Sequence, residues 1–129
     1  MSSDLLARAQ LFANIEPGLT FWSREVFEKG AEEVIKLCKA GRYEYDVKDI
    51  LNTDGEAVLE RIAKAGLQFV VPNSKFDELP APPIALTARG NLELMERRSI
   101  SIVGTRNPTT YGARVASEFA AGFADRDFD

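Results

Sequence analysis

The feature that most constrains this chain is a change of hydrophobic period at Gly66. Before it, apolar residues recur at spacings of three and four, which is typical of amphipathic helices. After it, short runs of β-branched and aromatic residues end at proline or glycine, which is typical of strands. The sequence therefore predicts an α/β protein with a helical domain at residues 1–66 and a second, strand-containing domain at residues 67–129.

Glycine and proline residues divide the first part into four predicted helices. The expected boundaries are Pro17-Gly18 after the first helix, a Thr20 cap and Gly30 around the second, Gly41 after the third, and a Thr53-x-x-Glu56 capping box before the fourth. Residues 41–52 show no clear period. We expect Trp22, Phe27 and Cys38 to lie in the core of this small bundle.

Three short apolar runs in the second part predict strands at residues 67–71, 84–88 and 99–103. Residues 72–83 contain four prolines and predict a loop. A helix is predicted at residues 110–125. Because strands this short are not stable alone, we expect all three to lie in one sheet.

Composition excludes several classes of protein. The chain has 129 residues and is 45% apolar, so it can form a core, but no apolar run is long enough to span a bilayer. The N-terminal residues lack a signal-peptide hydrophobic segment. Cys38 is the single cysteine and histidine is absent, which argues against an internal disulfide, a zinc site and a histidine general base. We therefore expect a soluble cytoplasmic protein that is neither a metalloenzyme nor a histidine-dependent hydrolase.

Positive charge is concentrated in residues 89–114. This range contains five arginines, no lysine and two glutamates, whereas the whole chain has a formal net charge of −4. Arginine suits bidentate recognition of phosphate, although charge alone favours a solvated surface with chance clustering. We expect Arg89 to have a structural role at a strand end, and Arg97 and Arg98 to be solvated.

One segment combines several features of a phosphate site. Gly104 follows the third predicted strand, and Thr109 is the expected N-cap of the helix that follows. Free amides at that helix N-terminus would attract an anion, while Thr105 and Arg106 add a hydroxyl and a guanidinium. The spacing from Gly104 to Gly112 matches neither G-x-G-x-x-G nor a P-loop. A plain strand-to-helix turn that serves only the fold remains an alternative.

Three segments in order resemble the DprA/Smf DNA-processing family. Residues 102–106 with Thr109-x-Tyr111-Gly112 resemble its Gly-Ser/Thr-Arg-x-x-Ser/Thr-x-Tyr-Gly signature. Residues 86–92 resemble its Leu-Tyr-Val-Arg-Gly-Asn-Leu segment, and residues 71–79 resemble an upstream strand and turn. The helical part is weakly similar to the N-terminal extension of some members. The chain departs from the pattern in packing positions: Phe76-Asp77, Thr87 and Thr110.

The resemblance implies an extended Rossmann-like, doubly wound sheet without a nucleotide cofactor, of which this chain holds the first part. It implies binding of single-stranded DNA, delivery of that DNA to a RecA-type recombinase during natural transformation, and a homodimer in the full-length protein. Arg106 would contact a DNA phosphate, assisted by Thr105 and Thr109, while Gly104 and Gly112 shape the loop. Tyr111 is a candidate for base stacking, but we expect it to pack against the sheet.

The sequence ends before the family's next strand, so we expect an incomplete domain with weak DNA binding. We expect no membrane contact. Two other functions remain open. A nucleotide phosphoribohydrolase of the lysine-decarboxylase-like type also holds phosphate at a glycine-containing turn, but its Gly-Gly-x-Gly-Thr loop is absent from these residues. A helix-hairpin-helix DNA binder around residues 15–18 would lack its second glycine, so the acidic helical part fits a packing or protein-interaction domain better.

Overall fold

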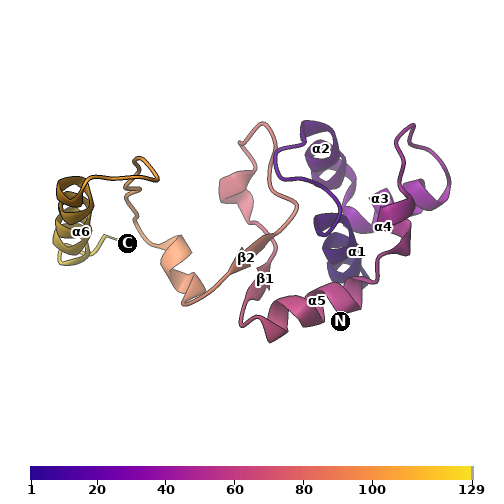
Figure 1. Ribbon diagram of the computed structural model, residues 1–129. Helices are drawn as coiled ribbons and strands as arrows, with labels where there is room; N and C mark the ends of the chain where they lie inside the picture. Colours follow the sequence, from indigo (N-terminus) through magenta and orange to yellow (C-terminus); the bar gives the residue numbers. More distant parts are fainter. Residues whose placement is uncertain (129) are drawn as a thin grey trace. The chain divides into compact units, whose positions relative to one another are not determined.

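A computed structural model of the chain describes residues 1–128, which form two compact units, Met1–Arg89 and Gly90–Asp129 (Figure 1). The first unit contains helices and a two-stranded sheet, and the second contains a short 3₁₀ helix and one long helix. No helix among residues 1–128 is long and apolar enough to cross a membrane. The expected domain boundary after residue 66 stays a prediction.

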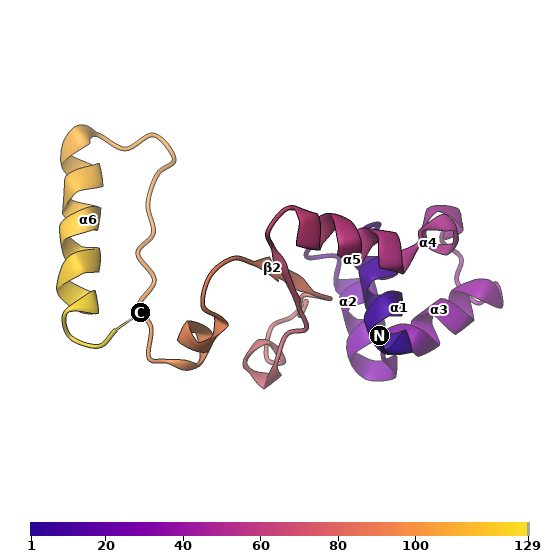
Figure 2. The same cartoon turned by 90° about the horizontal axis from the view of Figure 1, so that it is seen from below.

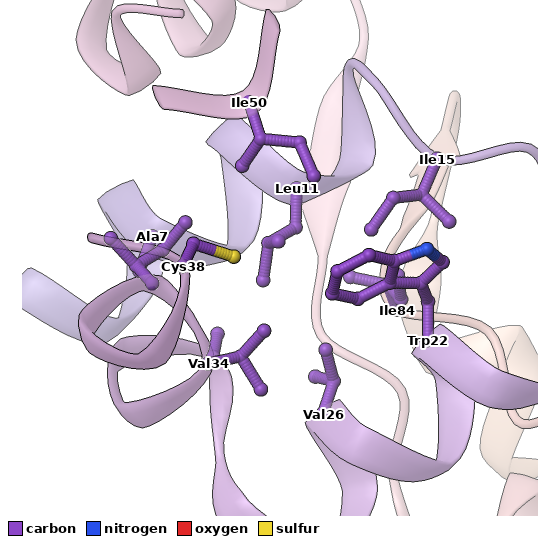
Figure 3. Close-up of a cluster of buried hydrophobic side chains, with 11 residues drawn as sticks. Ala7, Leu11, Ile15, Trp22, Val26, Val34, Cys38, Ile50 and Ile84 are labelled. Carbon is purple, nitrogen blue, oxygen red and sulfur yellow. The ribbon is translucent and has the colours of Figure 1, made fainter. Parts of the chain in front are cut away.

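The first unit contains five α-helices. They are α1 (Ser3–Phe12), α2 (Thr20–Lys29), α3 (Ala31–Lys39), α4 (Lys48–Asn52) and α5 (Gly55–Lys64). Helix α1 is central and packs against α3, α4 and α5. Leu11 of α1 and Val34 of α3 are fully buried at the centre of the core (Figure 3). The remaining core residues are Ala7, Ile15, Trp22, Val26, Ala31, Ile35, Cys38, Ile50 and Ile84.

Two of the expected core residues are confirmed and the third is wrong. Trp22 is 8% exposed and Cys38 is 2% exposed, whereas Phe27 is 47% exposed. Phe27 follows the buried Val26, and one residue corresponds to about 100° of rotation around a helix, so it lies at the edge of the buried face. Burial raises the pKa of the Cys38 thiol, which stays neutral in the core.

Both threonine caps predicted for the helical part are wrong. Leu19 precedes α2 without a side-chain cap, and Thr20 is the first helical residue. At α5, Asp54 is the N-cap, and its carboxylate accepts hydrogen bonds from the amides of Glu56 and Ala57. The Thr53 hydroxyl instead donates to the Asp49 carbonyl at 2.7 Å.

Helix α4 lies within residues 41–52, where no period was visible. Its five residues are too few to show a helical pattern, and it is held by burial of Ile50 and by a hydrogen bond from the Gln10 side chain to the Ile50 carbonyl. Its position therefore depends on α1, which is distant in sequence.

A polar contact on α2 joins it to the segment after α3. Glu25 accepts hydrogen bonds from the Lys29 ammonium and, at 2.6 Å, from the Tyr43 hydroxyl. The Lys29 bond, with that of Tyr43, holds the pKa of Glu25 below its ordinary value. The same carboxylate and burial raise the pKa of Tyr43, so its hydroxyl remains a donor.

Two of the three predicted strands are confirmed. Strands β1 (Gln68–Val70) and β2 (Leu86–Ala88) pair antiparallel, with Phe69 opposite Thr87. Phe69 meets Phe12 of α1 edge-on, with ring centroids 5.5 Å apart, so the sheet packs against the helices. The segment between the strands contains the 3₁₀ turn η1 (Ser74–Phe76).

The third predicted strand, at residues 99–103, is wrong. The chain is extended there and runs beside α6 (Thr110–Ala124), after the 3₁₀ helix η2 (Leu92–Glu96) (Figure 2). A strand requires hydrogen bonds to a neighbour, and none of residues 1–128 pairs with this segment. Its Val103 side chain is 89% exposed. The described fold is thus mixed helix and strand with a two-stranded sheet.

Candidate nucleic-acid interface

Helix α6 begins as the sequence predicted. The Thr109 hydroxyl accepts a hydrogen bond from the Gly112 amide at 3.1 Å, which makes Thr109 the N-cap. The Ala113 amide bonds to the Thr109 carbonyl at 3.0 Å. The amides of Thr110 and Tyr111 have no hydrogen-bond partner among the described residues. Two donors therefore remain free at the positive end of the α6 dipole.

The residues before the cap form an exposed turn. The Thr105 hydroxyl accepts a hydrogen bond from the Asn107 amide at 3.2 Å, so Thr105 already stabilises the turn. Arg106 is exposed, and its guanidinium has no hydrogen bond or ion pair within residues 1–128. All five of its N–H donors are available to a ligand.

The two glycines of the turn have different roles. Gly104 does not have a positive φ, so its backbone does not use the conformation that only glycine adopts readily. A Cβ at this position would meet no atom within 4 Å, which leaves the main chain accessible from that side. At Gly112, a Cβ would lie 3.4 Å from the Thr109 hydroxyl oxygen, so this glycine leaves room for the cap.

Tyr111 is 67% exposed, so the expectation that it packs against the sheet is wrong for the described residues. Its place at the second position of α6 turns the ring outward, where the Arg114 guanidinium lies 5.7 Å from the ring centroid. Arg114 also forms an ion pair with Glu118 at 3.7 Å. The N-terminal turn of α6 therefore carries an exposed aromatic ring beside free amides.

The remaining arginines of the basic range have structural contacts. Arg89 donates to the Ala65 carbonyl at the end of α5, with an N···O distance of 3.0 Å, which confirms a structural role. The Arg98 guanidinium lies 4.0 Å from the centroid of the Phe128 ring, a cation–π contact that no sequence pattern indicated. The sequence could not indicate this contact, because its partner Phe128 is distant along the chain.

Comparison with known proteins matches the same part of the chain. The family described as DNA recombination-mediator protein A matches residues 71–129. The DNA processing protein DprA of Bacillus subtilis (strain 168) is 51% identical over 37 residues. Residues 71–129 are therefore similar to the DprA/Smf family. The aligned stretch is 28% of this chain and 12% of the relative, so the chain spans a small fraction of the DprA protein that it matches.

The DprA/Smf match includes the candidate site and excludes helices α1 to α5. It begins at Val71 and contains β2, the Gly104–Gly112 turn and α6. No solved structure matches the chain significantly. The family match therefore concerns the turn and the arginines around it. The helical part is described from the structure alone.

Proposed function

We propose that this chain is a binding module for single-stranded DNA and that the turn at residues 104–112 holds a backbone phosphate. The observation that carries the proposal is Arg106, a fully available guanidinium three residues before a capped helix N-terminus in a segment that matches a DNA recombination-mediator family. Free amides and the dipole at a helix N-terminus favour an anion, and arginine adds charge-assisted hydrogen bonds.

The exposed Tyr111 ring supplies a second component of such an interface. Proteins that bind single strands combine cationic groups along the backbone with aromatic rings on which bases stack. Tyr111 is the next residue after Thr110, whose amide is free. A phosphate bound to the free amides would therefore bring a neighbouring base towards the Tyr111 ring. In this proposal Thr105 and Thr109 hold the turn, and Gly104 leaves space for the strand.

In the cell, we propose that the bound strand is protected and passed to a RecA-type recombinase in DNA uptake and natural transformation, without a catalytic step and in the cytoplasm. The full-length protein would act as a homodimer. The family match favours this function over the phosphoribohydrolase alternative.

The experiment compares Arg106→Ala with Arg126→Ala in binding to a fluorescent single strand. Arg126 is a matched control, because it follows the C-terminal end of α6, about 22 Å from the N-terminal cap (15 helical residues at about 1.5 Å each), and donates to the Gly122 carbonyl. Anisotropy is measured over a salt series with poly-T and mixed-sequence strands. We expect weak binding by these 129 residues compared with a full-length relative.

Arg106→Ala should weaken binding by about 1.5–3 kcal/mol, the range for a hydrogen bond to a charged group. The slope of log affinity against log salt should fall by about 0.7, which corresponds to one phosphate of a single strand. The loss of affinity should be the same for the poly-T and the mixed-sequence oligonucleotide. Arg126→Ala should change the affinity little. An unchanged salt slope together with a loss of folding stability would show that the turn serves only the fold.

A further inference from the structure

The first unit contains a pocket of about 190 Å³ between α2 and the chain that follows β1. Its walls are about equally polar and apolar, and the apolar part includes Val26, Phe27, Phe76 and Ile84. An apolar protein cavity of about 150 Å³ is sufficient for benzene, so this pocket has room for one aromatic ring and a short substituent. None of the residues of the proposed DNA site lines it.

Ser23 places a hydroxyl in this pocket. The residue is 5% exposed and is the one polar residue of residues 1–128 among the fully buried set. Its amide bonds to the Leu19 carbonyl at 3.1 Å, but its side chain has no hydrogen bond to any described residue. The hydroxyl faces the open pocket without a protein partner, so Ser23 presents a donor that a ligand can satisfy.

Arg8 of α1 adds a positive charge to the same pocket. Its side chain is 15% exposed, and its Nη1 donates to the Ile84 carbonyl at 2.7 Å. Its Nε forms an ion pair with the Asp4 carboxylate at 3.6 Å, which is too long for a hydrogen bond, and has no hydrogen-bond partner within residues 1–128. The Nε–H donor of this largely buried cation is therefore without a hydrogen bond.

We infer that the pocket binds a small carboxylate attached to an apolar body, with the carboxylate at Arg8 and Ser23 and the body between the apolar walls. A guanidinium and a hydroxyl both donate, and a carboxylate only accepts, so the two sides are complementary. The one acidic side chain of the lining, Asp77, is exposed, where water screens its charge. This ligand site is independent of the proposed DNA binding.

Three probes with the same phenylalkyl body and different head groups show which charge the pocket selects. They are 3-phenylpropionate, its neutral amide 3-phenylpropionamide, and the cation 3-phenylpropylamine, each titrated into the whole chain and followed by the amide NMR signals of Ser23, Gly30 and Phe76. We expect saturable shifts with the carboxylate and at least tenfold weaker binding of the amide and the amine. Equal binding of the amide, stronger binding of the amine, or absence of saturable shifts with the carboxylate would overturn the proposal.

Variants of Ser23 test the donor directly. Ser23→Ala removes only a hydroxyl without a protein partner, so the fold should persist while the carboxylate binds about tenfold more weakly, which is about 1.4 kcal/mol. Ser23→Leu should fill the pocket and abolish binding. Ser99→Ala, in the second unit, is the matched control and should bind like the original chain. Unchanged binding by Ser23→Ala would refute the role of this hydroxyl, and retained binding by a folded Ser23→Leu would place the ligand elsewhere.

Discussion

Gly55 is the position where the close packing of α1 and α5 can be tested most sharply. A Cβ added to Gly55 would lie 2.3 Å from the Leu6 carbonyl oxygen and 3.0 Å from the carbonyl carbon. Ordinary carbon–oxygen contacts begin at about 3.3 Å, so the two helices would have to separate by about 1 Å. Both Leu6 atoms belong to the backbone of α1, and no rotation of a side chain can relieve the contact.

Gly55→Ala should therefore destabilise the first unit, although alanine is the better helix former. Overpacking costs about 1–3 kcal/mol, and replacing a helical glycine by alanine recovers about 0.5–1 kcal/mol. We expect a net loss of about 1–2 kcal/mol. Urea unfolding followed by the fluorescence of Trp22, the chain's single tryptophan and a buried residue of this unit, measures it.

Gly122→Ala in α6 is the control for helix propensity. A Cβ there would lie 3.7 Å from the Arg126 guanidinium, an ordinary contact, so the substitution should raise helicity and leave the Trp22 transition unchanged. If Gly55→Ala is as stable as the original chain, or more stable, the close approach of α1 and α5 is not a constraint on the fold.

Two further predictions concern polar contacts. Thr109→Ala removes the cap of α6 and should cost about 1 kcal/mol, seen as roughly fivefold faster hydrogen exchange of the Gly112 amide; unchanged exchange would contradict the capping role. Glu25→Gln should cost about 1 kcal/mol at neutral pH. Because the folded-state pKa of Glu25 is lowered, this contribution is complete above its ordinary value of about 4.3 and is lost as the pH falls through the lowered pKa. The Trp22 unfolding curves of the two proteins should therefore converge in acid, and a difference that is constant with pH would refute the assignment.

The helices were the most predictable part of the fold. A helix closes its hydrogen bonds within four residues, so the spacing of apolar residues and the glycines at Gly30, Gly41 and Gly66 were sufficient to place α2, α3 and α5. The cap of α6 was predictable for the same reason, because Thr109 and the Gly112 amide that it binds are three residues apart. The signal for α5 was misassigned by one residue, since Asp54 rather than Thr53 is the cap.

The candidate site was predictable only in its local part. Sequence located Arg106 between Gly104 and the Thr109 cap, and the structure adds that this guanidinium is without a partner within residues 1–128. The exposure of Tyr111 was not predictable, because it depends on what the rest of the chain covers. The Arg98 contact with Phe128 joins residues thirty positions apart and has no local signature.

The sequence by itself determined where the helices other than α4 form, where the chain changes to extended structure at Gly66, and which turn presents Arg106. Only the tertiary structure decided that residues 68–70 and 86–88 pair while residues 99–103 do not. It also decided that Gly55 meets the backbone of α1 and that Ser23 and Arg8 share a pocket. The physical reason is range: helix spacing and caps act over three or four residues, whereas strand pairing, close helix contacts and pockets depend on atoms brought together from distant parts of the chain.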